Sequence, residues 1–176
     1  MNHEVVINSD RSKAIEMARL LAHDGRFMSL LKRRVAFKTS SQEDPCSPAM
    51  DAYLRIEMSP YLLDMGFSCR VYDNPVDGAG PLLLAERLEE GATLTVLSYG
   101  HADVIRGQED RWRKGLSPWE LQQDGIRVYG RGTADNKGQH SINLEALRSV
   151  LSKRGKLGFN IKLILETGEE TGSPGL

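Results

Sequence analysis

The sequence lacks the features that mark several large classes of protein. Its only two cysteines, Cys46 and Cys69, are too few for a disulfide framework and too far apart for a CxxC metal or redox pair. Lysine and arginine together number 23 against 24 aspartates and glutamates, so no basic excess favours nucleic acid or another polyanion. No run approaches the roughly 18 apolar residues that a membrane span needs. These absences predict a chain that binds neither nucleic acid nor membranes.

The N-terminal residues and the scarcity of cysteine also bear on location. Residues 1–10 combine neither a basic start nor a long apolar segment, so we expect no secretion signal. Few cysteines without a disulfide pattern are typical of proteins from a reducing compartment. We therefore expect a cytoplasmic protein.

Hydrophobic periodicity predicts helices in the first third of the chain. Apolar residues recur at helical spacing over 14–21, behind the potential caps Ser9 and Asp10. A second helix is expected over 27–34, where cationic residues suit its C-terminus. The first part of the chain is therefore expected to be helical.

A third helix and then strands are expected further along. The helix should start after the cap Ser47, be interrupted at Pro60 and stop at Gly66. Beyond it, short apolar or alternating segments bounded by turn residues predict strands. Strands are expected over 67–72, 82–88, 93–99, 126–129 and 159–165.

The last third of the chain alternates strands with a helix. That helix fits residues 141–151, with Ile142, Ala146 and Val150 on one face. Strands alternating with helices favour a layered α/β fold. We therefore predict an α/β protein with a helical N-terminus followed by a mixed sheet.

Three polar clusters each follow an expected strand, where ligand and catalytic groups usually lie in open α/β sheets. The first contains His101 and Asp103. A neutral imidazole is a good zinc ligand, and a carboxylate two residues along an extended chain lies on the same side and can hold the second ring nitrogen. A lone His-x-Asp pair is more often a hydrogen-bonded surface pair, and this alternative stays open.

The second cluster is the glycine-rich segment 129–138, in which Asp135 stands just before a helix. Glycines spaced by one residue permit a tight turn, and Asp135 could act as a helix cap or as a ligand. A phosphate-binding loop is disfavoured, because the segment lacks the third glycine of GxGxxG and has Lys137 and Gly138 in the wrong order for a Walker motif.

The third cluster is the adjacent pair Glu169 and Glu170. Neighbouring carboxylates repel each other unless a cation or a shared proton compensates their charge. Such a pair is usually just solvated. After an apolar strand and beside glycines, it is also a candidate for one metal ligand and one proton-transfer group.

Together the clusters supply the mixed nitrogen and oxygen donors of hydrolytic zinc, cobalt or manganese sites. In their order and spacing they resemble the zinc-dependent amidohydrolases and exopeptidases, a family that includes aminoacylase, acetylornithine deacetylase, succinyl-diaminopimelate desuccinylase, carboxypeptidase G and carnosine-type dipeptidases. The resemblance is carried by Gly100-His101-Ala102-Asp103-Val104, Trp112, Pro118-Trp119, Asp124-Gly125, Tyr129-Gly130-Arg131-Gly132, Asp135, Lys137-Gly138 and Gly168-Glu169-Glu170.

This resemblance implies a three-layer α/β/α sandwich of the zinc-exopeptidase type. Residues 1–176 would be the N-terminal portion of the metallopeptidase catalytic domain. The C-terminal part of that domain and the lid domain, through which full-length relatives often form homodimers, would be absent. The implied cofactors are two divalent metal ions, zinc first, with cobalt or manganese as alternatives.

The resemblance also assigns roles to residues. His101, Asp135 and Glu170 would be metal ligands, with Asp135 bridging two ions and followed by a cis peptide. Asp103 and Glu169 would be the catalytic carboxylates, the first orienting His101 and the second acting as general base on a water between the metals. The reaction would be hydrolysis of an amide or peptide bond in a dipeptide or an N-acyl amino acid, and the last residues look closer to the dipeptidase branch.

Two hypotheses follow. The family's dinuclear site needs five protein ligands and this chain supplies three, so the 176 residues alone are expected to bind metal weakly and to be inactive. The first hypothesis is therefore a part of a metal-dependent hydrolase. The alternative is a non-catalytic α/β binding module or an inactive fragment of such an enzyme.

Overall fold

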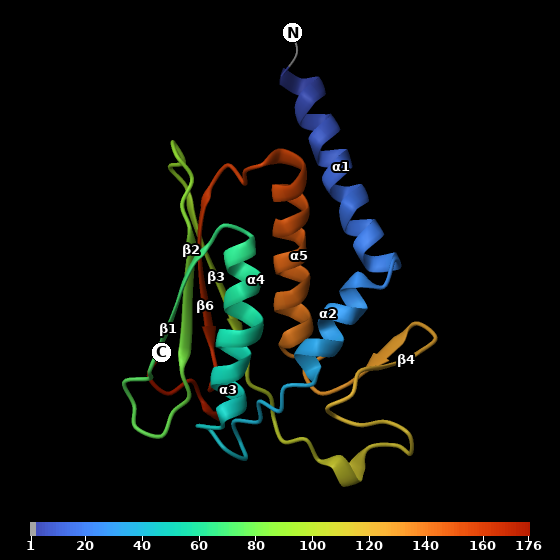
Figure 1. The fold of residues 1–176 in the computed structure, drawn as a ribbon, viewed down its shortest axis with the longest axis vertical. Coiled ribbons are helices and arrows are strands. Elements are labelled where there is room, and N and C mark those ends of the chain that lie inside the picture. Colours follow the sequence, from blue (N-terminus) through green and yellow to red (C-terminus); the bar gives the residue numbers. More distant parts are fainter. Residues whose placement is uncertain (1–2) are drawn as a thin grey trace.

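The computed structural model describes residues 3–176, with side chains from Ser9 onward. A four-stranded sheet stands on one side of the molecule and the helices pack on the other (Figure 1). The helical elements are α1 (His3–His23), α2 (Arg26–Val35), α3 (Pro48–Ala52), the π-helical turn η1 (Tyr53–Met58), α4 (Ser59–Asp64), the 3-10 turn η2 (Glu109–Arg111), α5 (Lys137–Arg154) and the 3-10 turn η3 (Glu169–Thr171). The strands are β1 (Ser68–Tyr72), β2 (Leu82–Arg87), β3 (Thr95–His101), β4 (Gln122–Asp124), β5 (Arg127–Tyr129) and β6 (Asn160–Glu166).

The first helix is longer than its sequence pattern predicts. Because α1 begins at His3, Ser9 and Asp10 lie inside it, and the prediction that they cap it is wrong. No glycine or proline precedes Ser9 to stop the helix. Relative to alanine, Ser or Asp inside a helix costs only about 0.5 kcal/mol. The second helix is confirmed and starts after Gly25, whose φ of 84° is left-handed.

The third predicted helix forms as a continuous run of three helical pieces. Its cap is confirmed, since the Ser47 hydroxyl accepts a hydrogen bond from the Ala49 N–H at 3.3 Å. Pro60 does not break the run, because the wider turn η1 precedes it and Pro60 lies in the first turn of α4. The run stops before Gly66, as predicted, where φ is 78°.

The sheet is mixed, as predicted, with strand order β1-β2-β6-β3. β1 and β6 each pair antiparallel with β2, whereas β3 and β6 run parallel with His101 opposite Glu166. The carboxyl ends of β3 and β6 therefore lie side by side at one edge of the sheet. The short strand β4 was not expected, since its polar residues 122–124 have low β-propensity, and it forms a hairpin with β5.

Helices cover only one face of the sheet within residues 3–176 (Figure 1). The core between them contains Tyr53, Leu54, Met58, Leu62, Leu83, Leu144, Leu163 and Leu165. The other face exposes Leu84, Leu97 and Tyr99. The described residues thus build two of the three layers of the expected sandwich.

The face of α5 was wrongly predicted. Ile142 is 59% exposed, and Leu144 instead packs in the core. α5 contacts the sheet on one side and α1 and α2 on the other, so a single apolar stripe does not describe it. No helix within residues 3–176 is both long and apolar enough to cross a membrane.

Candidate active site

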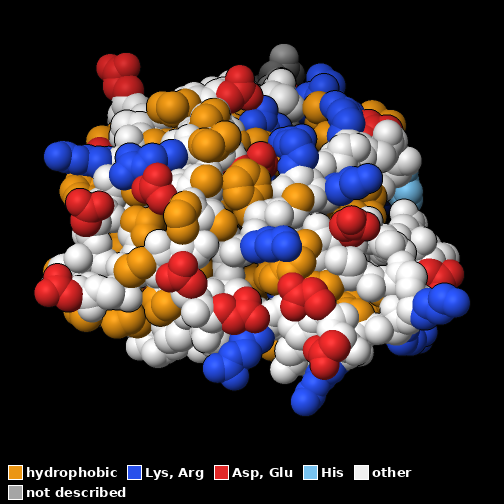
Figure 2. Space-filling model, turned by 60° about the horizontal axis from the view of Figure 1, so that its bottom comes forward, with side chains coloured by type: hydrophobic (Ala, Val, Ile, Leu, Met, Phe, Trp, Pro, Cys, Tyr) orange, Lys and Arg blue, Asp and Glu red, His pale blue; other side chains and the backbone are white. Residues whose placement is uncertain are grey.

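The candidate site lies where three segments meet at the carboxyl ends of β3 and β6. His101 is the last residue of β3, and Glu169 and Glu170 begin η3 just after β6. Asp135 precedes α5, and the Asp135–Asn136 peptide is cis, as the resemblance implies. Figure 2 turns this end of the molecule toward the viewer and shows acidic side chains among apolar and basic ones.

The structure places His101 close to Asp135 and also close to Glu169 and Glu170, but Asp135 does not belong to the group of donor atoms that all lie near one another. Nε2 of His101 lies 3.1 Å from Oδ1 of Asp135 and 3.9 Å from Oε2 of Glu169. One donor atom from each of His101, Glu169 and Glu170 lies within 4.8 Å of the others. The imidazole is buried, while the side chains of Asp135 and Glu169 are 66% and 42% exposed, so a ligand can reach the cluster from the acidic side.

Asp103 links His101 to the segment that carries Glu169 and Glu170. Its buried carboxylate accepts hydrogen bonds from Nδ1 of His101 at 3.2 Å and from the N–H of Glu169 at 3.2 Å. It also accepts hydrogen bonds from the Ser41 hydroxyl at 2.6 Å and the N–H of Glu170 at 3.1 Å. Burial alone would raise the pKa of Asp103, but these donors outweigh burial and lower it. Asp103 can therefore position the imidazole and both glutamates, and it cannot reach a substrate.

His101 is flanked by carboxylates at both ring nitrogens. Burial acts to lower its pKa, but the hydrogen bonds to Asp103 and Asp135 and the charge of Glu169 raise the pKa to about 9. In the metal-free protein the ring is thus protonated at neutral pH and donates from both nitrogens. A metal ion at Nε2 would take the place of that proton.

The negative charge of the cluster exceeds what one imidazole can balance. Partial burial, together with the charges of Asp135, Glu169 and Asp103, raises the pKa of Glu170 against the opposing effect of His101. A divalent cation would relieve this repulsion, and one imidazole with several carboxylates suits zinc, cobalt or manganese. The residues present therefore fit a divalent metal ion.

Residues 39–42 support the site in a way that the sequence analysis missed. Ser40 pairs with Val104 in a parallel bridge, and the hydroxyl of Thr39 donates to the carbonyl of Ala102 at 2.7 Å. Next to Ser41, the amide of Gln42 donates to the carbonyl of Glu170 at 3.1 Å. A polar loop more than 60 residues away in sequence carries no local signal of this role, since only the fold brings it here.

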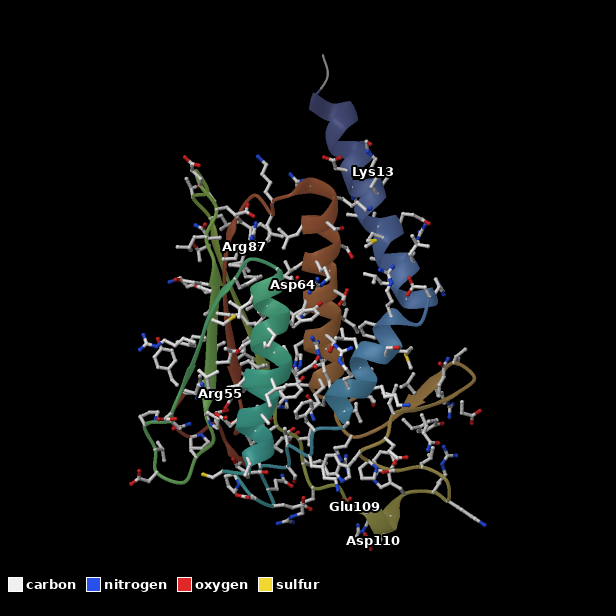
Figure 3. All side chains as sticks on the ribbon, viewed as in Figure 1. Lys13, Arg55, Asp64, Arg87, Glu109 and Asp110 are labelled. Atoms are coloured by element: carbon white, nitrogen blue, oxygen red, sulfur yellow. The ribbon has the colours of Figure 1, made fainter. Side chains whose placement is uncertain are left out.

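The segment between β3 and α5 is braced by the two tryptophans of the predicted motif. Nε1 of Trp112 donates to the carbonyl of Gly107 at 2.9 Å, and Nε1 of Trp119 donates to Glu109 at 2.6 Å. Figure 3 shows Glu109 and Asp110 at the same end of the molecule as the carboxyl ends of the strands. These motif residues therefore shape the loop that leads from His101 to Asp135.

Gly138 allows the turn that carries Asp135 to close. A Cβ at Gly138 would overlap the carbonyl of Thr133, a backbone group that cannot rotate away. We expect Gly138→Ala to lower the free energy of unfolding by about 3 kcal/mol, as overpacking does, in urea denaturation. The control Gly155→Ala has open space at its Cβ and a φ of 70°, so it should cost only about 1 kcal/mol. Equal losses in the two variants would contradict the steric argument.

Known proteins resemble this chain over much of its length. A model of the peptidase family M20/M25/M40 matches residues 97–176. The Beta-Ala-His dipeptidase of Mus musculus is 31% identical over 162 residues, which are 86% of this chain and 32% of the relative. An acetylornithine deacetylase of Edwardsiella ictaluri is 29% identical over 150 residues, covering 85% of this chain and 37% of the relative.

The fold is shared as well. The crystal structure of human carnosine dipeptidase 1 superimposes with a TM-score of 0.79 at 29% identity, covering 94% of this chain and 36% of that one. The chain thus spans about a third of the length of the relatives it matches. The predicted α/β fold is confirmed by this match.

Proposed function

Because residues 97–176 belong to the peptidase family M20/M25/M40, we propose that this chain takes part in metal-dependent hydrolysis of an amide or peptide bond. The observation that carries the proposal is the convergence of His101, Asp135, Glu169 and Glu170 at one edge of the sheet. A buried imidazole facing three carboxylates is a donor set that binds divalent ions.

We propose His101, Asp135 and Glu170 as ligands of two divalent ions, zinc first and cobalt or manganese as alternatives. Bound ions would supply Lewis-acid activation of a water molecule and of the scissile carbonyl. Asp103 supports this assignment, because it fixes the ring of His101 and leaves Nε2 directed at Asp135.

Glu169 is the proposed general base. Its carboxylate is partly exposed and lies on the open side of the cluster, within 3.9 Å of Nε2 of His101. There it can take the proton of the attacking water and deliver it to the leaving amine. Its backbone N–H is anchored on Asp103 at 3.2 Å, which limits where the carboxylate can move.

The proposed substrates are dipeptides, with N-acyl amino acids as the other class. The names of the relatives support this range, since they include a Beta-Ala-His dipeptidase and an acetylornithine deacetylase. The location we propose is the cytoplasm, and the unpaired Cys46 and Cys69 suit a reducing compartment.

We further propose that residues 1–176 are the N-terminal portion of the catalytic domain of such a peptidase. The relatives are about three times as long, and the described residues cover one face of the sheet with helices and leave the other exposed. In this proposal the remaining ligands and the lid domain, through which we expect homodimers to form, lie outside these residues.

Metal titration of the purified 176-residue chain tests the site. We expect calorimetry to find weak binding of Co²⁺ or Zn²⁺. In His101→Ala the metal affinity should fall at least about tenfold, because the imidazole is the one nitrogen donor of the cluster. The control His23→Ala removes an exposed histidine at the end of α1 and should bind as the unmodified chain does.

Two results would contradict these proposals. Equal binding by His101→Ala and the unmodified chain would refute the metal site. Tight zinc binding with robust dipeptide hydrolysis by the 176 residues would refute the view that ligands are missing.

A further inference from the structure

A series of hydrogen bonds, buried at its inner end and half-buried at Asn136, leads from the helical core to the candidate site. The hydroxyl of Tyr53 lies 2.7 Å from Nε2 of His140. Nδ1 of His140 lies 3.2 Å from Oδ1 of Asn136, and the same oxygen accepts the N–H of His101 at 3.2 Å. One amide oxygen thus joins the first turn of α5 to the end of β3.

The partners of Asn136 show that Nδ1 of His140 carries a proton. Its Oδ1 must be the acceptor end, because a backbone N–H points at it and its Nδ2 donates to Gln139. Nδ1 of His140 must then carry a proton and donate to Oδ1. In the neutral ring Nε2 of His140 is then the acceptor, and the hydroxyl of Tyr53 donates to it.

The residues around Tyr53 and His140 hold these hydrogen bonds in one arrangement. Tyr53 is fully buried and stacks edge-on against Phe37 with ring centroids 5.3 Å apart. Burial, with the nearby charges of Arg34 and Lys137, lowers the pKa of His140 well below its ordinary value, so the ring is neutral as the bonding requires.

Gly100 lets the two elements approach closely enough for these bonds. A Cβ at Gly100 would come within 3.1 Å of Oδ1 of Asn136 and 3.4 Å of Cβ of His140. A side chain there would push the first turn of α5 away from β3. The lack of room for a side chain at Gly100 and the hydrogen bonds of Asn136 both indicate that the first turn of α5 is held at a fixed distance from β3.

We propose that Tyr53, His140 and Asn136 are positioning residues that set the spacing between His101 and Asp135. Asn136 directly follows Asp135 and holds the backbone of His101, so the amide fixes both ends of the 3.1 Å contact between the two side chains. The inference rests on the proposed function, because the contact between His101 and Asp135 is part of the proposed metal site.

The first test reads the histidine tautomer in the metal-free protein. We expect ¹⁵N NMR to find His140 neutral and protonated at Nδ1, and hydrogen exchange to find the amide of His101 protected. His140 protonated at Nε2, or an unprotected amide of His101, would overturn the proposal. Neither measurement depends on metal binding.

The second test compares variants by Co²⁺ affinity and by the visible spectrum of the bound ion. His140→Leu removes both hydrogen bonds and should weaken binding about 10-fold or more, as loss of a residue that orients a ligand does. His140→Asn can still place an N–H near the position of Nδ1 and should recover most of the affinity. Tyr53→Phe removes only the donor to Nε2 and should fall between them, while Nδ1 of His140 stays protonated because Asn136 still accepts from it.

Tyr61→Phe is the matched control. Tyr61 lies in α4, the helical piece that follows η1, and its hydroxyl bonds to Glu145 and Arg148, away from the site. Its loss should lower stability as Tyr53→Phe does, without changing Co²⁺ affinity or spectrum. Equal changes of affinity in both tyrosine variants, or unchanged affinity in His140→Leu, would overturn the proposal. Absence of Co²⁺ binding by the unmodified protein would overturn the proposed function alone, since the tautomer and exchange readouts still decide this inference.

Discussion

Replacing Glu169 by alanine should lower the rate of dipeptide hydrolysis by about 10²–10⁴-fold while metal content stays close to that of the unmodified protein. The measurement needs a form of the protein that turns over a dipeptide, with elemental analysis of the same sample. The expectation follows from the partly exposed position of Glu169, from which its carboxylate can reach a substrate while His101, Asp135 and Glu170 remain as the proposed ligands. A general base contributes to the transition state, so kcat should fall with little change in KM.

Substitutions of two other glutamates distinguish a metal ligand from a general base. Glu170→Ala should lose metal and activity together, because Glu170 is a proposed ligand. Glu43→Ala removes an exposed glutamate from the loop after Lys38 and should change neither. If Glu169→Ala instead lost its metal, Glu169 would be a ligand, as its place in the donor cluster also allows. Full activity of Glu169→Ala would remove it from the mechanism altogether.

The convergence of the site could be predicted because it depends on strand ends. His101 and the pair Glu169 and Glu170 each follow a strand whose pattern is readable, and parallel strands carry such residues to one edge. The role of Asp103 beside His101 also follows from the two-residue repeat of an extended chain. Its hydrogen bonds to the N–H groups of both glutamates could not be predicted, since they depend on how η3 turns after β6.

Long-range contacts of buried polar groups escaped prediction for a similar reason. Tyr53 and His140 are 87 residues apart and touch only because α5 packs against the helical run that contains η1. Periodicity also failed at Ile142, where a helix with neighbours on two sides does not obey one stripe. Local patterns therefore predicted most of the elements and the polar clusters at the strand ends, while the packing between elements decided what holds these clusters in place.

Asp103 is the residue whose loss should disturb the structure most. Asp103→Asn replaces one acceptor oxygen by an amide that would face the donors His101, Ser41 or the N–H groups of the two glutamates. Breaking a buried, charge-assisted contact of this kind costs about 3–5 kcal/mol of unfolding free energy, measurable by urea denaturation. Metal affinity should fall about 10–100-fold as well, because the imidazole and η3 lose their common anchor.

The graded comparison is Ser41→Ala, which removes one of the four hydrogen bonds to the Asp103 carboxylate and leaves the carboxylate and the other three in place. It should cost about 1 kcal/mol, the net value of a single hydrogen bond, and change metal affinity much less. An Asp103→Asn variant as stable as Ser41→Ala would mean that the carboxylate charge is not what holds His101 and η3 together. The hydrogen bonds of residues 39–42 would then have to keep the cluster assembled, and a Thr39→Val and Gln42→Ala double variant should show the larger loss.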